Sequence, residues 1–239
     1  MPKAVKFALA GVSAATLAHF LPTAASLRPV RARLLPSLAG LGAPGHLALT
    51  FDDGPDPAST PAFLDALDAL GWKATFFMLG SMAERAPGLE REVAERGHEV
   101  GVHGYEHSNH LRHGPLWVER DMARAKDLLS ELTGTTPRWA RPPYGVLTAS
   151  SLRAAHRNGL RTVLWTTWGR DWRRQASPRT VEHDVSATLV PGGTVLLHDS
   201  DCTSAQSCWL SALGALPALA ATWSEAGYTV GPLSEHGTP

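Results

Sequence analysis

The strongest constraint on the fold of this 239-residue chain is a regular alternation that begins at His46. Short runs of strand-forming residues alternate with amphipathic segments of helical length, and a glycine follows most of those segments. We expect strands at residues 46–51, 74–79, 99–103, 138–141, 161–166, 194–198 and 228–231. We expect helices at residues 60–70, 88–96, 116–132, 148–158, 178–189 and 210–226. This alternation predicts a parallel sheet, and we favour a distorted (β/α)7 barrel in a single domain, with an open doubly wound sheet as the alternative.

Composition limits the class of protein. The 22 Lys and Arg balance 22 Asp and Glu, and 44% of the residues are hydrophobic, so the chain can bury a core and is not disordered. The balanced charge gives no reason to expect nucleic acid as a partner. Cys202 and Cys208 are too few for a disulfide scaffold, and two free thiols or one small disulfide remain equally open.

The N-terminus has the pattern of an export signal. Lys3 and Lys6 precede an apolar stretch over residues 7–21, and small residues around Ala25 offer a cleavage site. The stretch is shorter than the roughly 20 residues that span a bilayer. We therefore expect export, either as a secreted protein with cleavage after Ala25 or through an uncleaved anchor that reaches Leu27. An N-terminal helix packed on the domain is the alternative.

A basic linker is expected to follow. Arg28, Arg31 and Arg33 lie between the apolar stretch and a glycine-rich turn over residues 40–45. We accordingly divide the chain into an export or anchor segment with its linker, residues 1–44, and a folded domain, residues 45–239.

Polar residues stand where the expected strands end. In a (β/α) barrel the catalytic side chains come from the loops at the carboxyl ends of the strands. The residues placed there are Asp52, Asp53, His103, Arg141, His198 and Asp199, with Asp171 in the loop after the fifth strand. The fold thus predicts that these side chains meet on one rim.

Two of these positions predict a metal site. Asp52 and Asp53 are adjacent on an extended chain, so their side chains diverge and can hold different roles, one binding a metal and one accepting a proton. His103 and His107 are four residues apart and can converge on one cation, with a carboxylate as third ligand and an open position for water. In isolation, an Asp-rich turn would be the alternative.

Other histidines compete for this role. His98 precedes its strand and should lie at the opposite end of the barrel. His110 and His113 could form a rival metal set with His107, although loop histidines are more often solvated.

Three further segments add candidate groups. Arg141 precedes two prolines and Tyr144, a rigid turn that could hold the guanidinium against a carboxylate and present a backbone N–H to an oxyanion. His198 could act as a general acid if a carboxylate raises its pKa. The tryptophans between residues 165 and 172 could form a groove wall or ordinary core.

Together, five motifs resemble the polysaccharide deacetylases, a family also described as the NodB-homology domain or carbohydrate esterase family 4. The resemblance covers about residues 45–231 and follows the family's order. The matching segments are residues 50–55 (TFDDGP), His103 with His107, residues 141–145 (RPPYG), Asp171 with Trp172, and Leu196 with His198.

The resemblance implies a barrel of the glycoside hydrolase and deacetylase type that removes N-acetyl groups from N-acetylglucosamine-containing glycans and releases acetate. Asp53, His103 and His107 would hold a divalent metal, with zinc first and cobalt or nickel as alternatives. Asp52 would be the general base and His198 the general acid. The supporting roles would be Arg141 orienting Asp52, Asp171 pairing with His198, the Tyr144 N–H stabilising the oxyanion, and Leu196 with Trp172 lining the acetyl pocket.

The family also implies a partner and a location. We expect an acetylated glycan as substrate, a monomer, and export to the cell wall, with a membrane contacted only through an N-terminal anchor. Another amide or an O-acetyl ester is the alternative substrate, and a catalytically inactive glycan-binding homologue is the alternative function.

Two positions depart from the family pattern. Gly104 stands where the family usually has Ser or Thr, so we expect a less firmly held loop and weaker metal binding. Trp168 stands where the fourth motif often begins with Asp, which changes substrate contacts more than the catalytic pair.

Overall fold

The computed structural model describes residues 19–27, 31 and 33–237. Its centre is a curled parallel sheet with strand order β5-β4-β3-β2-β1-β7-β6, and β8 pairs with the start of β1. The strands are β1 (His46–Asp52), β2 (Thr75–Met78), β3 (Glu99–Val102), β4 (Trp139–Ala140), β5 (Arg161–Thr162), β6 (Thr167–Trp168), β7 (Thr194–His198) and β8 (Thr229–Gly231).

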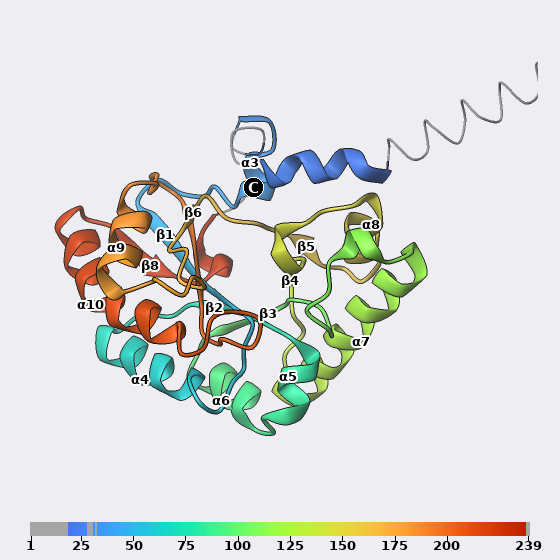
Figure 1. Cartoon of the computed structure of the whole chain (residues 1–239), viewed down its shortest axis with the longest axis horizontal. Helices are drawn as coiled ribbons and strands as arrows, with labels where there is room; N and C mark the ends of the chain where they lie inside the picture. Colours follow the sequence, from blue (N-terminus) through green and yellow to red (C-terminus); the bar gives the residue numbers. More distant parts are fainter. Residues whose placement is uncertain (1–18, 28–30, 32, 238–239) are drawn as a thin grey trace, which may run out of the picture.

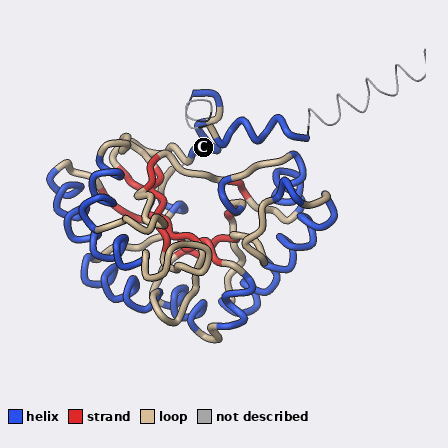
Figure 2. The backbone as a smooth tube through the Cα atoms, in the orientation of Figure 1, coloured by secondary structure: helices blue, strands red, loops and turns tan. Residues whose placement is uncertain are grey.

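Helices surround this sheet on its outer side, as Figure 2 shows. They are α3 (Pro36–Ala39), α4 (Thr60–Leu70), α5 (Gly80–Arg85), α6 (Leu89–Glu95), α7 (Pro115–Thr133), α8 (Ala149–Arg157), α9 (Pro178–Ser186) and α10 (Trp209–Glu225). Four short 3₁₀ turns also occur, η1 (Leu21–Ser26), η2 (His110–Arg112), η3 (Pro143–Gly145) and η4 (Leu233–Glu235). The predicted distorted (β/α)7 barrel in one domain is confirmed, and the barrel is open between β5 and β6, which do not pair.

The core explains why these segments form. All residues of β1 except His46 are buried, as expected for a central parallel strand covered on both faces. The ring of Phe51 packs against Phe63 of α4 and Phe76 of β2, with centroids 5.0 Å apart in both pairs. α4 ends at Gly71 in the left-handed conformation.

The expected strand over residues 161–166 is shorter than predicted. It stops at Thr162 because the next carbonyls turn away from the sheet: those of Val163 and Leu164 accept hydrogen bonds from the Arg141 guanidinium. The chain then forms the two-residue β6, which is too short to give a periodic signal in the sequence. The helix α5 was also not predicted from the sequence.

The predicted export signal lies largely outside the described residues, since residues 1–18 are not among them. Within the residues that are described, no helix combines the length and the hydropathy needed to cross a membrane. Arg31, which the sequence places in the expected basic linker, is 3% exposed, and its guanidinium bonds to two backbone carbonyls.

Candidate active site

The residues predicted to share a rim lie around one pocket of about 280 Å³. The parallel pairing of β1 and β7 places Asp52 directly beside His198, so both strands deliver their last residue to the same edge. The lining residues are Asp52, Asp53, His103, His107, Tyr144, Gly145, Trp165, Trp168, Trp172, Leu196, His198, Thr203 and Ser204. Arg141 and Asp171 lie behind this lining, each against one of the predicted catalytic groups.

Three side chains form a compact group with the composition of a metal site. The Oδ1 atom of Asp53 lies 3.3 Å from Nε2 of His103 and 3.3 Å from Nε2 of His107. The potential ligand atoms of these three residues all lie within 4.8 Å of one another. Among the residues that the structure describes, this is the one such group of three or more His, Cys, Asp and Glu side chains.

The orientation of the two imidazoles suits a cation. The Nδ1–H of His103 donates to the backbone carbonyl of Arg141 at 2.7 Å, which turns Nε2 toward Asp53. Burial opposes a charge on His103, but the carboxylates of Asp52 and Asp53 raise its pKa, so a cation at Nε2 would take the place of a proton. Burial, together with the nearby His103, lowers the pKa of His107 to about 4, so its ring is neutral. Asp53 Oδ1 is buried and accepts no hydrogen bond. One carboxylate oxygen and two imidazole nitrogens that face one another are therefore a ligand set that fits a divalent cation.

The backbone conformation of Asp53 and one hydrogen bond to its side chain set the position of its carboxylate. Its backbone adopts φ 82°, a region that costs energy for residues with a Cβ and that is common at functional sites. Its second oxygen, Oδ2, accepts a hydrogen bond from Thr203 Oγ1 at 2.7 Å. The sequence analysis missed Thr203, and its only sequence signal was a hydroxyl residue in the loop directly after the last motif.

Asp52 forms a buried ion pair with Arg141. The guanidinium donates to Asp52 Oδ1 at 2.7 Å and also to Thr50 and to the carbonyl of Leu164, and Arg141 is 1% exposed. The second oxygen of Asp52 is not engaged by Arg141 and lies 3.8 Å from His103 Nε2. One carboxylate oxygen is thus fixed while the other faces the metal-site group.

His198 forms the opposite side of the pocket and is bound by Asp171. Its Nδ1–H donates to Asp171 Oδ1 at 2.9 Å, and its backbone N–H donates to the other oxygen at 2.7 Å. Burial alone would lower the pKa of His198, but the charge and hydrogen bond of Asp171, with Asp53 and Asp52 nearby, raise it to about 10. The ring is therefore protonated at neutral pH.

Aromatic rings form the wall between these groups. Trp165, Trp168 and Trp172 follow one another with centroids 5.8 and 5.2 Å apart, and Trp172 contacts the ring of His198 edge-on. Tyr144 packs against His107 at 4.4 Å and has a backbone φ of 59°. The tryptophans are thus part of the pocket lining, and Trp168 occupies the position where the family often has Asp.

The loop that carries His107 is anchored although Gly104 lacks a side chain. Asp121 of α7 accepts hydrogen bonds from the backbone N–H groups of Tyr105 and Glu106, both at 3.0 Å. A Cβ on Gly104 would come within 2.9 Å of Asp121 Oδ2, and Gly104 has φ 102°. The carboxylate of Asp121 therefore holds the loop in place of the Ser or Thr hydroxyl that is absent at position 104.

Replacing Asp121 by Ala should loosen this loop. Two backbone N–H groups would lose a charged acceptor, so we expect the free energy of unfolding to fall by about 2 kcal/mol and zinc affinity to fall roughly tenfold. Urea denaturation and zinc titration measure the two effects. Asp127→Ala, at an exposed position of the same helix, is the control. Equal losses in both variants would contradict this role for Asp121.

The remaining histidines and the two cysteines do not line the pocket, although Cys202 Sγ lies 3.6 Å from the backbone carbonyl of Asp53. His98 precedes β3 and accepts from the backbone N–H of Ala74, as its place before the strand suggested. His110 contacts the Ser151 hydroxyl and His113 stacks on a tryptophan of α7, so the rival metal set is not assembled. Cys202 and Cys208 are both free thiols.

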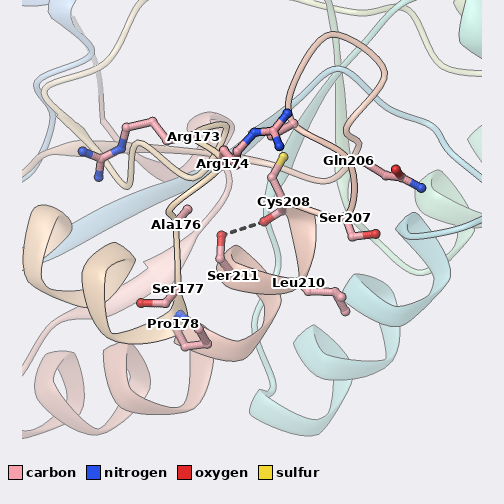
Figure 3. Close-up of a pocket in the computed structure, with 11 residues that line it drawn as sticks. Arg173, Arg174, Ala176, Ser177, Pro178, Gln206, Ser207, Cys208, Leu210 and Ser211 are labelled. Carbon is pink, nitrogen blue, oxygen red and sulfur yellow. Dashed lines mark hydrogen bonds between the residues drawn. The ribbon is translucent and has the colours of Figure 1, made fainter.

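A second, larger cavity of about 530 Å³ is lined in part by residues 205–208 (Figure 3). Its lining includes Arg173, Arg174, Ser177, Cys208 and Ser211, and the Ser211 hydroxyl donates to the carbonyl of Cys208 at 2.6 Å. None of the residues paired as base, acid or metal ligands contributes to it. The chemistry therefore belongs to the smaller pocket.

A family model described as polysaccharide deacetylase matches residues 41–163, which is half of the chain and includes the first three motifs. The chain belongs to the polysaccharide deacetylase family. The predicted family resemblance is thereby confirmed.

Individual relatives give the same result. A peptidoglycan-N-acetylglucosamine deacetylase of Bacillus cereus is 35% identical over 155 residues, which is 65% of this chain and 56% of that protein. A chitooligosaccharide deacetylase of Bradyrhizobium is 38% identical over 66% of this chain and 76% of that protein. A solved family 4 carbohydrate esterase of Streptomyces lividans, in complex with acetate, is 32% identical with TM-score 0.70, over 78% of this chain and 92% of that one. The chain thus spans only about half the length of the Bacillus deacetylase.

Proposed function

We propose that this chain is a metal-dependent deacetylase that removes N-acetyl groups from glycans containing N-acetylglucosamine and releases acetate. One observation carries the proposal: a group of one carboxylate and two imidazole ligand atoms lies between a carboxylate fixed by Arg141 and an imidazolium fixed by Asp171, in one pocket. Amide hydrolysis needs an activated water and a protonated leaving group, and these two side chains can supply both.

Asp53, His103 and His107 would hold the metal, with zinc as the first candidate because two imidazoles and one carboxylate are ligands that zinc prefers. When bound there, the cation would polarise the acetyl carbonyl and lower the pKa of water in the site. The geometry leaves the choice among zinc, cobalt and nickel to measurement.

The chain's own groups would then move the protons. Asp52, with Oδ1 held by Arg141, would accept the proton of the attacking water on Oδ2. His198, with Nδ1 held by Asp171, would give the proton on Nε2 to the departing amine nitrogen. The backbone N–H of Tyr144 would stabilise the oxyanion, and Leu196 with Trp172 would enclose the acetyl methyl group. The products are acetate and a free amino sugar.

The substrate polymer is part of the proposal. The names of the two curated relatives support peptidoglycan and chitooligosaccharides as candidates, and their activity on such glycans favours export to the cell wall. The same set of groups could hydrolyse another amide or an O-acetyl ester. A catalytically inactive glycan-binding protein is less favoured, because the base, acid and ligand side chains are all present and in contact distance.

The test is acetate release from chitooligosaccharides and from peptidoglycan. We expect a chelator to abolish release and added zinc to restore it, because hydrolysis depends on the cation at Asp53. His107→Ala should lower the zinc stoichiometry, whereas His113→Ala, outside the cluster, should retain it. A protein that binds stoichiometric zinc yet releases no acetate from any acetylated glycan would refute the proposed activity.

A further inference from the structure

We propose that the described residues between Thr23 and Gly40 (23–27, 31 and 33–40), which precede the region matched by the family model, form a strap across the open side of the barrel, and that Arg31 is a positioning residue for the Trp165 wall of the pocket. The kinetic part of this inference rests on the deacetylase activity proposed above.

The strap bonds to the sheet on both sides of the opening between β5 and β6. The backbone N–H of Leu164, just after β5, donates to the carbonyl of Leu38 at 2.8 Å. On the other side, Thr194 of β7 donates through Oγ1 to the carbonyl of Gly40 at 2.7 Å. Figure 1 shows α3 above the sheet, between the labels of β5 and β6. The first bond lies directly after β5, and the second lies on β7, the strand that pairs with β6.

The first part of the strap is also fixed to the domain. Thr23 Oγ1 donates to the carbonyl of Leu147 at 2.8 Å. Ala25 is buried and packs in a small apolar cluster with Leu147 and Leu164. Residues before the family region therefore contact Leu147 and Leu164, and Leu164 directly precedes Trp165 of the pocket wall.

Arg31 joins the strap to that wall. Its guanidinium is buried and donates from Nη1 to the carbonyl of Ala25 and from Nη2 to the carbonyl of Trp165, both at 2.8 Å. It also lies over the indole of Trp165, 5.3 Å from the ring centroid. Charged hydrogen bonds in a buried setting fix geometry, and loss of the donor would leave two carbonyls unsatisfied.

Trp165 in turn contacts the proposed catalytic machinery. The Trp165 ring packs directly on Gly145, because a Cβ at Gly145 would lie 2.6 Å from the ring. Gly145 follows Tyr144, whose backbone N–H is the proposed oxyanion donor. The Arg141 guanidinium lies 5.8 Å from the same ring and bonds to the carbonyl of Leu164, the neighbouring residue. Arg31 therefore acts on the pocket through Trp165 and touches no reacting atom.

The strap conflicts with processing after Ala25. Cleavage there would remove the Thr23 contact and detach the carbonyl that Arg31 binds, and it would place a charged amino terminus at Ser26. The strap thus predicts that the working protein retains its chain from Thr23 onward.

The main experiment compares Arg31→Leu, Arg31→Lys and Arg33→Leu in the full chain, using acetate release from a chitooligosaccharide. Arg33 is an exposed arginine of the same segment and serves as the matched control. For Arg31→Leu we expect KM to rise at least fivefold with kcat and zinc stoichiometry changed less than twofold, because the wall moves and the metal ligands do not. Arg31→Lys should recover part of the loss, and Arg33→Leu should match the wild type.

Unchanged KM in folded Arg31→Leu would overturn the inference. If that variant does not fold, Arg31→Lys decides: a raised KM supports the positioning role and a wild-type KM overturns it. If the wild type itself releases no acetate, the proposed function fails. The strap is then judged by hydrogen exchange, where faster exchange of residues 163–166 in the Arg31 variant than in the Arg33 variant supports it and equal exchange overturns it.

The intact mass of the protein recovered from its own source organism tests whether the chain is cleaved after Ala25. A chain that retains Thr23 is expected. A fully active form that begins at Ser26 would overturn the strap.

Discussion

Asp52→Asn is expected to reduce acetate release by roughly 10²–10⁴-fold while leaving zinc binding intact, because this is the range that a positioned general base contributes. The amide oxygen of Asn can still accept from Arg141, so the ion-pair site keeps a partner for the buried guanidinium. Asn cannot, however, take a proton from water. Steady-state kinetics and zinc stoichiometry on the same preparation measure both quantities.

The matched variant is Asp53→Ala. This change removes the carboxylate that both imidazoles face, so we expect zinc to be lost and acetate release to fall to background. Thermal unfolding of both variants separates loss of function from loss of fold. If Asp52→Asn loses as much zinc as Asp53→Ala, the division of roles between the two adjacent carboxylates is wrong.

Asp171→Asn should move the alkaline limit of activity to lower pH. In the wild type, Asp171 raises the pKa of His198 against the opposing effect of burial, so the general acid stays protonated through neutral pH and loses its proton as pH rises through about 10. A divalent cation at Asp53 would bring this pKa down, since its positive charge disfavours the imidazolium. Without the Asp171 charge, burial dominates and His198 would lose its proton at a still lower pH.

The measurement is the pH dependence of kcat/KM for both proteins. We expect a loss of about 10²-fold or more at pH 8 in the variant, with a smaller loss at pH 6, where more of His198 remains protonated. Asp184→Asn, a change at a surface carboxylate that pairs with Arg173, is the control and should leave the profile unchanged. An unshifted alkaline limb in Asp171→Asn would argue against His198 as the acid.

Local patterns were sufficient to predict most of the barrel and the position of the site. The alternation of strand and helix periods predicted parallel strands, and the carboxyl ends of parallel strands meet at one edge. Asp52 and His198 were therefore expected on one rim, and the structure pairs them directly across β1 and β7. His103 and His107 lie beside Asp53 for the same reason, because their strand also ends at that rim.

The supporting contacts could not be derived in this way. Thr203 bonds to Asp53 from 150 positions away, and Asp121 holds a loop from a helix whose sequence looks ordinary. Arg31 has the sequence context of a solvated linker residue, yet it is buried against Trp165. Such pairs depend on where distant segments pack, and no local period or motif encodes that.

The sequence by itself determined which residues end each strand, and hence which catalytic and metal-binding side chains can meet at one rim of the barrel. Only the tertiary structure decided that the barrel opens between β5 and β6 and that Leu38 and Gly40 bond to residues on either side of the opening. The physical reason is range. Periodicity and turn chemistry act over a few residues, whereas closure of the barrel depends on hydrogen bonds between segments more than a hundred residues apart, such as Arg31 with Trp165.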